Sequence, residues 1–333
     1  MDTFKRYSRA VSAVLEKRLG RFWRLWTLAL ILAVLIGAYR LTLAPPADFP
    51  LESVVSIARG ASASEIAEEL GDRNIVAHPS LFRFALRISG TGGRVQAGTY
   101  LFSAPENLLI VAYRLAAGAY GHPPVRLTLP EGETARDLSE RVNAAFPDIR
   151  ASVFLAEARP YEGYLFPDTY FFLPSASADD IVASMRKNFD AKTAPLTDAI
   201  ALSGRSLSDI VVLASLIERE ARTSAAKRMV AGILLNRLAL GMPLQVDAVF
   251  GYIYGRDTYS PSLEDLKVDS PYNTYTHKGL PPGPIANPGL ESIEAALYPT
   301  KTDYLYYLTG KDGVMRYATT YAGHQANRRK YLD

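Results

Sequence analysis

The sequence of 333 residues lacks cysteine altogether and contains only four histidines. Without cysteine the chain can form no disulfide, no thiolate zinc site and no cysteine nucleophile. The histidines show no metal-ligand spacing, so we expect neither a metal nor a cofactor. An exported domain that needs no disulfide and a cytosolic protein are both compatible with this composition. The histidines stand at His78, His122, His277 and His324.

Three common catalytic motifs are missing as well. The chain has no Gly-x-Ser-x-Gly elbow, no phosphate-binding loop and no His-Glu-x-x-His helix. These absences argue against an α/β-hydrolase, a P-loop nucleotide hydrolase and a zinc protease of the usual types.

Basic charge is scarce outside the first residues. Residues 1–24 hold seven Lys and Arg against two Asp and Glu, so the rest of the chain carries about −2 of the net +3. Such a balance gives no overall basic charge for nucleic acid, and we expect no nucleic-acid partner. We expect the basic segment 1–21 to be a cytoplasmic tail.

Residues 22–43 form a long apolar stretch, and no charged side chain interrupts it between Leu25 and Tyr39. A helix over 22–43 would be roughly 33 Å long, enough to cross a hydrocarbon core of ~30 Å. Trp23 and Trp26 suit a membrane interface, and the preceding basic residues predict a cytoplasmic N-terminus. We therefore predict a single-pass membrane protein whose bulk is exported.

A cleaved signal peptide is the alternative interpretation of this segment. Its basic region would be only a few residues long, whereas here basic residues extend over about 24, and no small-x-small site follows directly. The uncleaved anchor is therefore our prediction. Residues 44–50, with three prolines, are expected to form a short, stiff linker.

Residues 51–122 and 123–200 share a pattern that suggests a duplication. In each, a strand ends at a glycine, a Ser or Thr caps a helix with an acid three residues later, and an aromatic strand closes the unit. This βααβ plan resembles the LysM module, which binds N-acetylglucosamine polymers. Capped helices can also be alike by chance, and docking or packing is the alternative role. The aligned pairs are Gly60 with Gly132, Ser62 with Thr134, and Glu65 with Asp137.

Residues 201–333 follow a different pattern and form the candidate catalytic domain. Capping and periodicity predict two consecutive helices, then a third helix, then a hairpin. The exported part is thus expected to be of the α+β class. The first helix is expected to be capped by Ser206 or Ser208 and to run to about residue 222. The other helices are expected at 224–240 and 290–298, and the strands at 304–308 and 314–319, joined by the turn Gly310-Lys-Asp-Gly313.

Glu218 is the main catalytic candidate because it stands late on the strongly apolar helix 206–222. A lone carboxyl beside apolar surface keeps its proton more easily, as a general acid in carbohydrate cleavage requires. Glu220 lies about 160° further around the helix. Two such carboxylates cannot easily straddle one glycosidic bond at the ~5–9.5 Å of a hydrolase pair. This helix is therefore expected to supply one acid.

Ordinary structural roles remain open for these residues. Glu218 and Glu220 could form ion pairs with Arg219, Arg222 or Lys227 on a solvated rim. Asp247 could be a second acid or a turn or cap residue. Several tyrosines could stack on sugar rings or pack in half-buried strands: Tyr252, Tyr254, Tyr259, Tyr272 and Tyr275.

Several longer motifs, in order along residues 50–330, resemble the MltG (YceG-like) family of bacterial endolytic murein transglycosylases. Members are anchored by one N-terminal transmembrane helix, so the resemblance implies a bacterial inner-membrane protein with a periplasmic catalytic domain. The motifs are Leu129-Pro-Glu-Gly132, Glu162-Gly-Tyr-Leu-Phe-Pro167-Asp168-Thr-Tyr170, Leu213-Ala-Ser-Leu-Ile-Glu218-Arg-Glu220, Gly241-Met-Pro-Leu-Gln245-Val-Asp247, and Ser270-Pro-Tyr272-Asn273-Thr274-Tyr275 with Gly279-Leu-Pro-Pro-Gly283.

The resemblance implies cleavage of the MurNAc-(β1→4)-GlcNAc bond of peptidoglycan without water, leaving a 1,6-anhydro-MurNAc end. Glu218 matches the catalytic Glu of the family. It would protonate the leaving oxygen and then take the proton from the C6 hydroxyl, so one acid is enough. The N-acetyl group of the substrate would hold the positive charge between these steps.

The resemblance also implies binding residues and partners. Peptidoglycan synthases near the membrane are the expected partners, and control of glycan strand length the expected role. Positions that match family motifs or flank them are candidates for the glycan cleft: Gln245, Asp247, Asn273, Tyr275, Tyr272, Glu220 and His324. The chain departs from the family at Met315 and Tyr317, in the places of a His and an aromatic residue, at Gln325 for Asn and at Ala248 for Pro.

Two other functions remain open. A hydrolase acting on the same polymer would need a second acid such as Asp247 and would release reducing ends. A non-catalytic wall-binding scaffold of the division machinery would function without Glu218.

Overall fold

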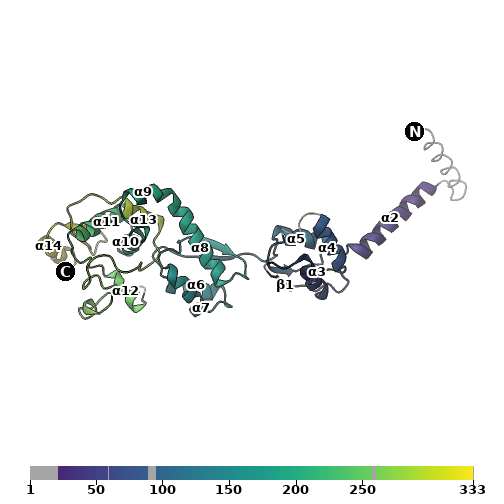
Figure 1. Ribbon diagram of the computed structural model, residues 1–333, viewed down its shortest axis with the longest axis horizontal. Coiled ribbons are helices and arrows are strands. Elements are labelled where there is room, and N and C mark those ends of the chain that lie inside the picture. The colour runs from purple at the N-terminus through teal and green to yellow at the C-terminus, as the bar shows by residue number, and fades with distance from the viewer. Residues whose placement is uncertain (1–21, 59, 89–94, 257–259, 333) are drawn as a thin grey trace, which may run out of the picture. The chain divides into compact units, whose positions relative to one another are not determined.

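The computed structural model describes residues 22–58, 60–88, 95–256 and 260–332 (Figure 1). The chain divides into two compact units, Met1–Pro123 and Pro124–Asp333. The expected tail 1–21 and Tyr259 lie outside the described residues. The fold mixes helices with short antiparallel strand pairs.

Helix α2, Trp23–Thr42, carries the apolar stretch. At 20 residues it is about 30 Å long, which matches the hydrocarbon core of a bilayer. None of the window Leu25–Thr42 is buried, and its mean hydropathy is 1.8. In the part of the chain that the structure describes, this is the one unbroken helix long and apolar enough to cross a membrane. It is compatible with a single-pass anchor.

The rest of the first unit has the element order strand, helix, helix, strand, followed by a third helix. Its strands pair antiparallel with Val55 opposite Tyr100, and Tyr100 is fully buried in the core below them. The elements are β1 Ser53–Ile57, α3 Ala63–Asp72, α4 Pro79–Ile88, β2 Gly98–Phe102 and α5 Leu108–Ala117.

The second unit opens with the same order of elements. Its first helix has a capping box like that of α3: Thr134 and Asp137 cap α6 as Ser62 and Glu65 cap α3. Helix α8 then packs against α7 (Figure 1). The likeness of residues 51–122 and 123–200 to LysM modules stays a prediction. The elements are β3 Val125–Thr128, α6 Ala135–Ala145, α7 Ala151–Ala158, β4 Thr169–Phe172 and α8 Ala178–Thr193.

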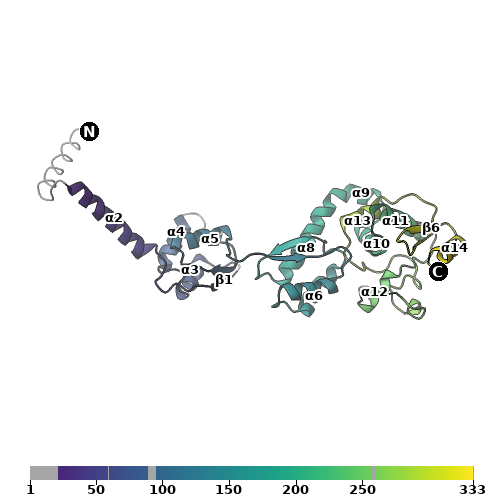
Figure 2. The ribbon, with the colours of Figure 1, turned by 180° about the vertical axis from the view of Figure 1, so that it is seen from behind.

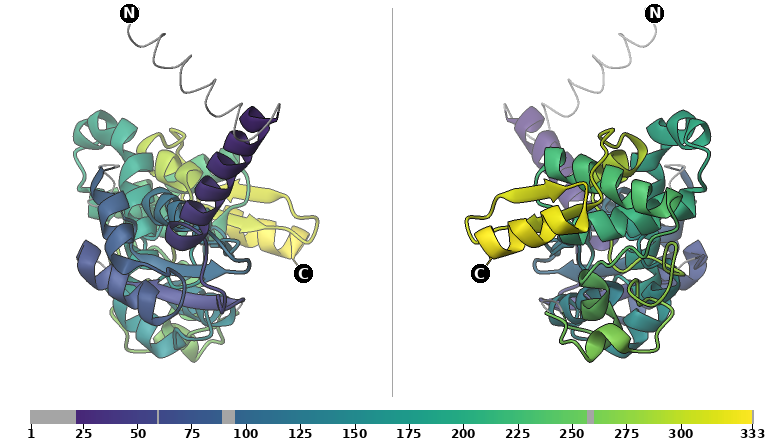
Figure 3. Two further views of the ribbon diagram at one scale, coloured as in Figure 1. Left: turned by 90° about the vertical axis from the view of Figure 1, so that its right-hand side faces the viewer. Right: turned by 90° about the vertical axis from the view of Figure 1, so that its left-hand side faces the viewer.

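The remainder of the second unit is built on three helices that pack on one another, α10, α11 and α13 (Figure 2). A β-hairpin and the last helix lie side by side (Figure 3, yellow). The elements are α9 Thr197–Leu202, α10 Leu207–Glu220, α11 Ser224–Ala239, α12 Ala248–Tyr254, α13 Leu290–Leu297, β5 Tyr306–Thr309, β6 Met315–Ala318 and α14 Tyr321–Tyr331. Single 3-10 turns lie at Arg159–Tyr161, Ala194–Leu196 and Asp265–Lys267.

Helix α10 ends two residues earlier than the sequence predicts. Ala221 has an extended backbone, with φ −138° and ψ 141°, and Thr223 caps the next helix. Glu218 and Glu220 therefore both lie in the last turn of α10. The second unit holds two hydrophobic cores, one under residues 125–185 and one around α10. Phe166 and Phe189 precede residue 201 in the chain but belong to the core around α10. The domain boundary expected at 200/201 stays a prediction.

Candidate active site

The site begins with the way α10 is anchored. Ser206 and Asp209 form a capping box at its start, which satisfies free backbone amides of the first turn. The eight residues from Ile210 to Ile217 are all buried. Because so much apolar surface is fixed in the core, the last turn has little freedom, and the position of Glu218 is well defined.

Three donors hold the carboxylate of Glu218. Lys227 Nζ lies 2.8 Å from Oε1, while the backbone N–H of Gly289 and the hydroxyl of Ser292 donate to Oε2 over 2.9 Å and 2.8 Å. Gly289 is the N-cap of α13, so the positive end of that helix also faces the carboxylate. Both oxygens are therefore fixed by groups that stabilise negative charge.

The ion pair of Glu218 with Lys227 is buried, with 7% and 3% of the two side chains exposed. The expectation of a lone acid beside apolar surface is therefore wrong, because a buried ammonium is in direct contact. The alternative of an ion pair on a solvated rim named Lys227 as one of three possible partners, and it is wrong as to the setting, because the pair is buried. Removing either partner of such a pair leaves a charge without compensation in a dry environment.

A second carboxylate, Glu131, lies beside the pair. Its Oε2 is 3.9 Å from Lys227 Nζ and its side chain is half exposed. Because oxygens of Glu131 and Glu218 lie 3.9 Å and 2.8 Å from one nitrogen, they are at most 6.7 Å apart. Burial and the charge of Glu218 raise the pKa of Glu131. A Cβ at Gly289 would lie 1.9 Å from Glu131 Oε1, so any side chain there would displace the Glu131 carboxylate from this position.

Glu220 faces a different group of residues. Tyr307 donates a hydrogen bond of 3.0 Å to its Oε2, and burial raises the pKa of Glu220 to about 7, with Asp247 adding to the effect. Asp247 in turn accepts a short hydrogen bond from Tyr275. Burial and this hydrogen bond raise the pKa of the Tyr275 hydroxyl. The two glutamates of α10 thus serve two separate clusters, as their angular separation on the helix predicts.

Gln245 and His324 both lie near Arg237. The guanidinium of Arg237 donates to Leu244 O over 2.8 Å and lies 3.4 Å from Gln245 Oε1. Gln245 has a φ of +52°, an unfavourable conformation for a residue with a side chain. His324 stacks on Tyr306 with ring centroids 5.4 Å apart. Burial lowers the pKa of His324, and Arg328 and Arg237 act in the same direction.

Asn273 is fully buried and organises its own loop. Its Nδ2 donates to Leu266 O and Val268 O, and its Oδ1 accepts from the backbone of Tyr275. With its amide groups used in this way, Asn273 suits a structural role better than a place in a glycan cleft. Tyr272, by contrast, is partly exposed and packs against Tyr252, with ring centroids 5.0 Å apart.

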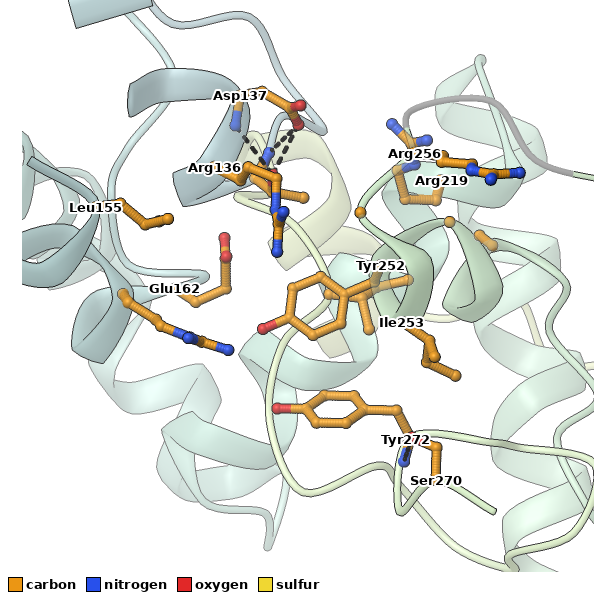
Figure 4. A pocket seen from close by; sticks show the side chains of 16 residues that line it. Arg136, Asp137, Leu155, Glu162, Arg219, Tyr252, Ile253, Arg256, Ser270 and Tyr272 are labelled. Carbon is orange, nitrogen blue, oxygen red and sulfur yellow. Dashed lines mark hydrogen bonds between the residues drawn. The ribbon is translucent and has the colours of Figure 1, made fainter. Parts of the chain in front are cut away.

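A pocket of about 230 Å³ lies next to these residues, lined by Arg219, Tyr252 and Tyr272 among others (Figure 4). Glu162 forms part of its wall and is almost completely buried. Its two oxygens accept from the backbone of Ala135, and Oε1 also accepts from Asn287 Nδ2, each over 3.1 Å. Burial raises the pKa of Glu162 to about 7.

Three residues of this site, Lys227, Glu131 and Glu162, are not predicted as site residues from the sequence. Lys227 was named only as a possible ion-pair partner, and Glu131 and Glu162 only within longer motifs. Their common signal was charge inside otherwise apolar or turn-forming segments, which alone does not identify a partner. Within the described ranges, no cluster of three or more His, Cys, Asp or Glu could hold a metal ion.

The chain is similar to curated bacterial proteins that share one name. A protein of Bacillus subtilis named endolytic murein transglycosylase is 32% identical over 84% of this chain and 84% of its own length. A protein of the same name from Streptococcus pneumoniae serotype 2 is 27% identical, and the match covers 84% of this chain and 58% of that protein.

A solved structure agrees with this grouping. The crystal structure of a YceG-like protein of Listeria monocytogenes has a TM-score of 0.57 to this chain at 32% identity. The match covers 82% of this chain and 98% of the Listeria chain. The YceG-like family itself matches residues 55–330, and the chain therefore belongs to the YceG-like family.

Proposed function

We propose that this protein is a membrane-anchored endolytic lytic transglycosylase of peptidoglycan. It would cleave MurNAc-(β1→4)-GlcNAc bonds in glycan strands and leave 1,6-anhydro-MurNAc ends. The observation that carries the proposal is the setting of Glu218, a carboxyl fixed at the end of a buried helix by Lys227, Ser292 and the amide of Gly289. Relatives that share 27–32% identity are named for this activity.

The three donors suit the two proton transfers of the reaction. When protonated Glu218 gives its proton to the leaving oxygen, a carboxylate remains that Lys227, Ser292 and Gly289 already stabilise. The same carboxylate then removes the proton from the C6 hydroxyl as that oxygen closes on C1. Both steps use the same carboxyl, which is protonated again at the end of the reaction.

The anchor would confine this activity to the membrane surface. Helix α2 would cross the inner membrane with the N-terminus in the cytoplasm, and the proline-containing segment 44–50 would keep the first unit close to it. New glycan strands emerge from their polymerases at this surface. Cleavage there would set strand length, with peptidoglycan synthases as partners and the two βααβ units as glycan-binding or docking elements.

A hydrolase is the second candidate because Glu131 supplies a second carboxylate near Glu218. The upper limit of 6.7 Å between the two oxygens includes the ~5–5.5 Å of a retaining pair. Asp247, the second acid considered from the sequence, pairs with Tyr275 instead. The masses of the products separate the two functions, since hydrolysis adds one water for each bond that is cleaved and the transglycosylase reaction adds none.

The full chain in detergent, incubated with polymerised glycan strands, provides the test. Internal fragments that end in 1,6-anhydro-MurNAc are expected. Reducing MurNAc ends would replace this proposal with the hydrolase. Binding of glycan without cleavage would instead favour a wall-binding scaffold.

A further inference from the structure

The pocket lined by Glu162 is rich in arginine. Four guanidinium groups and two carboxyl groups border it, together with two tyrosines and two hydroxyl side chains. A volume of about 230 Å³ leaves room for a small polar group. The charged residues are Arg136, Arg159, Arg219, Arg256, Asp137 and Glu162.

Both carboxyl groups are already occupied by donors of the protein. Asp137 accepts from the backbone and hydroxyl of Thr134 in the capping box, over 2.9 Å and 2.7 Å. Glu162 accepts from Ala135 and Asn287. With four guanidinium groups against two carboxyl groups, the pocket carries an excess of positive charge. Arginine is the side chain best suited to bind a carboxylate through two parallel hydrogen bonds.

Arg136 reaches across the pocket from α6 to the end of α12. A Cβ placed on Gly255 would lie 2.9 Å from its Cζ, so the guanidinium rests against the bare backbone of that glycine. Figure 4 shows the hydroxyl groups of Tyr252 and Tyr272 directed toward the side of the pocket where Glu162 lies. The pocket thus combines cationic groups with aromatic surface and hydroxyl groups, which together can hold an acidic peptide.

A short loop connects this pocket to Glu218. Glu131 lies beside Glu218 and Thr134 lines the pocket, and the Cα atoms of these two residues are at most about 11 Å apart. Arg219, which follows Glu218, also lines the pocket and donates to Gly132 O over 3.1 Å. A ligand bound here would therefore lie next to a sugar bound at Glu218.

We propose that this pocket binds a carboxylate of the peptide stem carried by MurNAc next to the bond that is cleaved, with Arg136 and Arg159 as its main contacts. The inference rests on the proposed function. Each MurNAc bears its peptide on the lactyl group, and such stems are short and carry carboxylates. Engagement of the stem would position the sugar chain at Glu218 and make the enzyme prefer strands that still bear peptides.

The test compares two substrates and four forms of the full chain in detergent. The substrates are glycan strands with intact stems and strands from which an amidase has removed them. The protein forms are wild type, Arg136→Gln, Arg159→Gln and the control Arg150→Gln, whose side chain is exposed and lies outside the pocket. We expect wild type and Arg150→Gln to prefer stem-bearing strands at least tenfold in kcat/KM. Each pocket variant should lose about tenfold of this preference, mainly through KM.

A direct binding measurement keeps the inference separate from catalysis. The binding of a soluble disaccharide with its stem, and of the same compound with amidated carboxylates, is followed by NMR titration. We expect the compound with free carboxylates to bind, and its binding to depend on Arg136 and Arg159. The amidated compound should not show this dependence. Equal cleavage of both substrates by wild type, or equal binding of both compounds, would overturn the inference. Arginine-dependent binding with no cleavage of any strand would retain it and refute the proposed function.

Discussion

Lys227 Nζ lies 2.8 Å from Glu218 Oε1, and both side chains are more than nine-tenths buried. The pair joins the last turn of α10 to the first turn of α11, and it places a fixed cation beside the candidate acid. A buried pair is weak evidence for stability as such, since the desolvation of two charges opposes their attraction. Its position at the end of a rigid helix points to a functional role.

Breaking this pair from one side should destabilise the protein strongly. We expect Lys227→Met to lower the free energy of unfolding by about 3–5 kcal/mol, because Glu218 would remain buried without its cation. The double variant Glu218→Gln/Lys227→Met carries neither charge of the pair, so much of the lost free energy of unfolding should be regained. Denaturant unfolding of the four proteins completes the double-mutant cycle. Strictly additive losses would show that the two side chains do not interact.

A side chain at Gly289 should displace Glu131. A Cβ would lie 1.9 Å from Glu131 Oε1 and 2.3 Å from Cδ, and φ at Gly289 is −74°, which alanine adopts without strain. We expect Gly289→Ala to displace Glu131 and to change kcat/KM by the same factor as Glu131→Ala. The double variant should be no worse than either single variant. Multiplying losses would mean that Gly289 acts independently of Glu131.

The raised pKa of Glu220 predicts how stability depends on pH. Burial raises this pKa from 4.5 to about 7, so the folded state binds a proton more tightly than the unfolded state. The free energy of unfolding should therefore fall as the pH rises from 4.5 to 7, by at most about 3 kcal/mol from this group. Above pH 7 the contribution is constant.

Glu220→Gln should reduce this slope, since glutamine keeps an acceptor for the Tyr307 hydroxyl but does not titrate. Part of the slope should remain, because burial also raises the pKa of Glu162 to about 7. Unfolding by denaturant at pH 5, 6, 7 and 8 measures the effect. The control is Glu264→Gln, whose side chain is 85% exposed and should leave the slope of wild type unchanged. An unchanged slope in Glu220→Gln would contradict the assigned pKa.

Local patterns predicted the main elements well. The capping residues Ser62, Thr134 and Ser206 start helices where the sequence places them. The hairpin β5–β6 forms around the expected Gly-Lys-Asp-Gly turn, with Tyr307 opposite Tyr317. These features depend on neighbours in sequence, and therefore a single sequence reveals them.

The surroundings of the candidate site could not be predicted in the same way. Lys227 stands on the helix after Glu218, Ser292 lies 74 residues away and Glu131 comes from the preceding βααβ unit. Such contacts depend on how three helices and a loop pack together. Asn273 shows the converse, since a motif position expected in the cleft is used to hold its loop. Periodicity gives the face of a helix but not its partner.

The central claim is that Glu218 is the acid and base of a lytic transglycosylase. The most direct measurement is digestion of polymerised glycan strands by the full chain, wild type beside Glu218→Gln, with the products weighed by mass spectrometry and Glu264→Gln as control. We predict internal fragments with 1,6-anhydro-MurNAc ends from wild type and control. Glu218→Gln should release them at a rate lower by a factor of ~10²–10⁴. Undiminished release of the same fragments by Glu218→Gln would contradict the account.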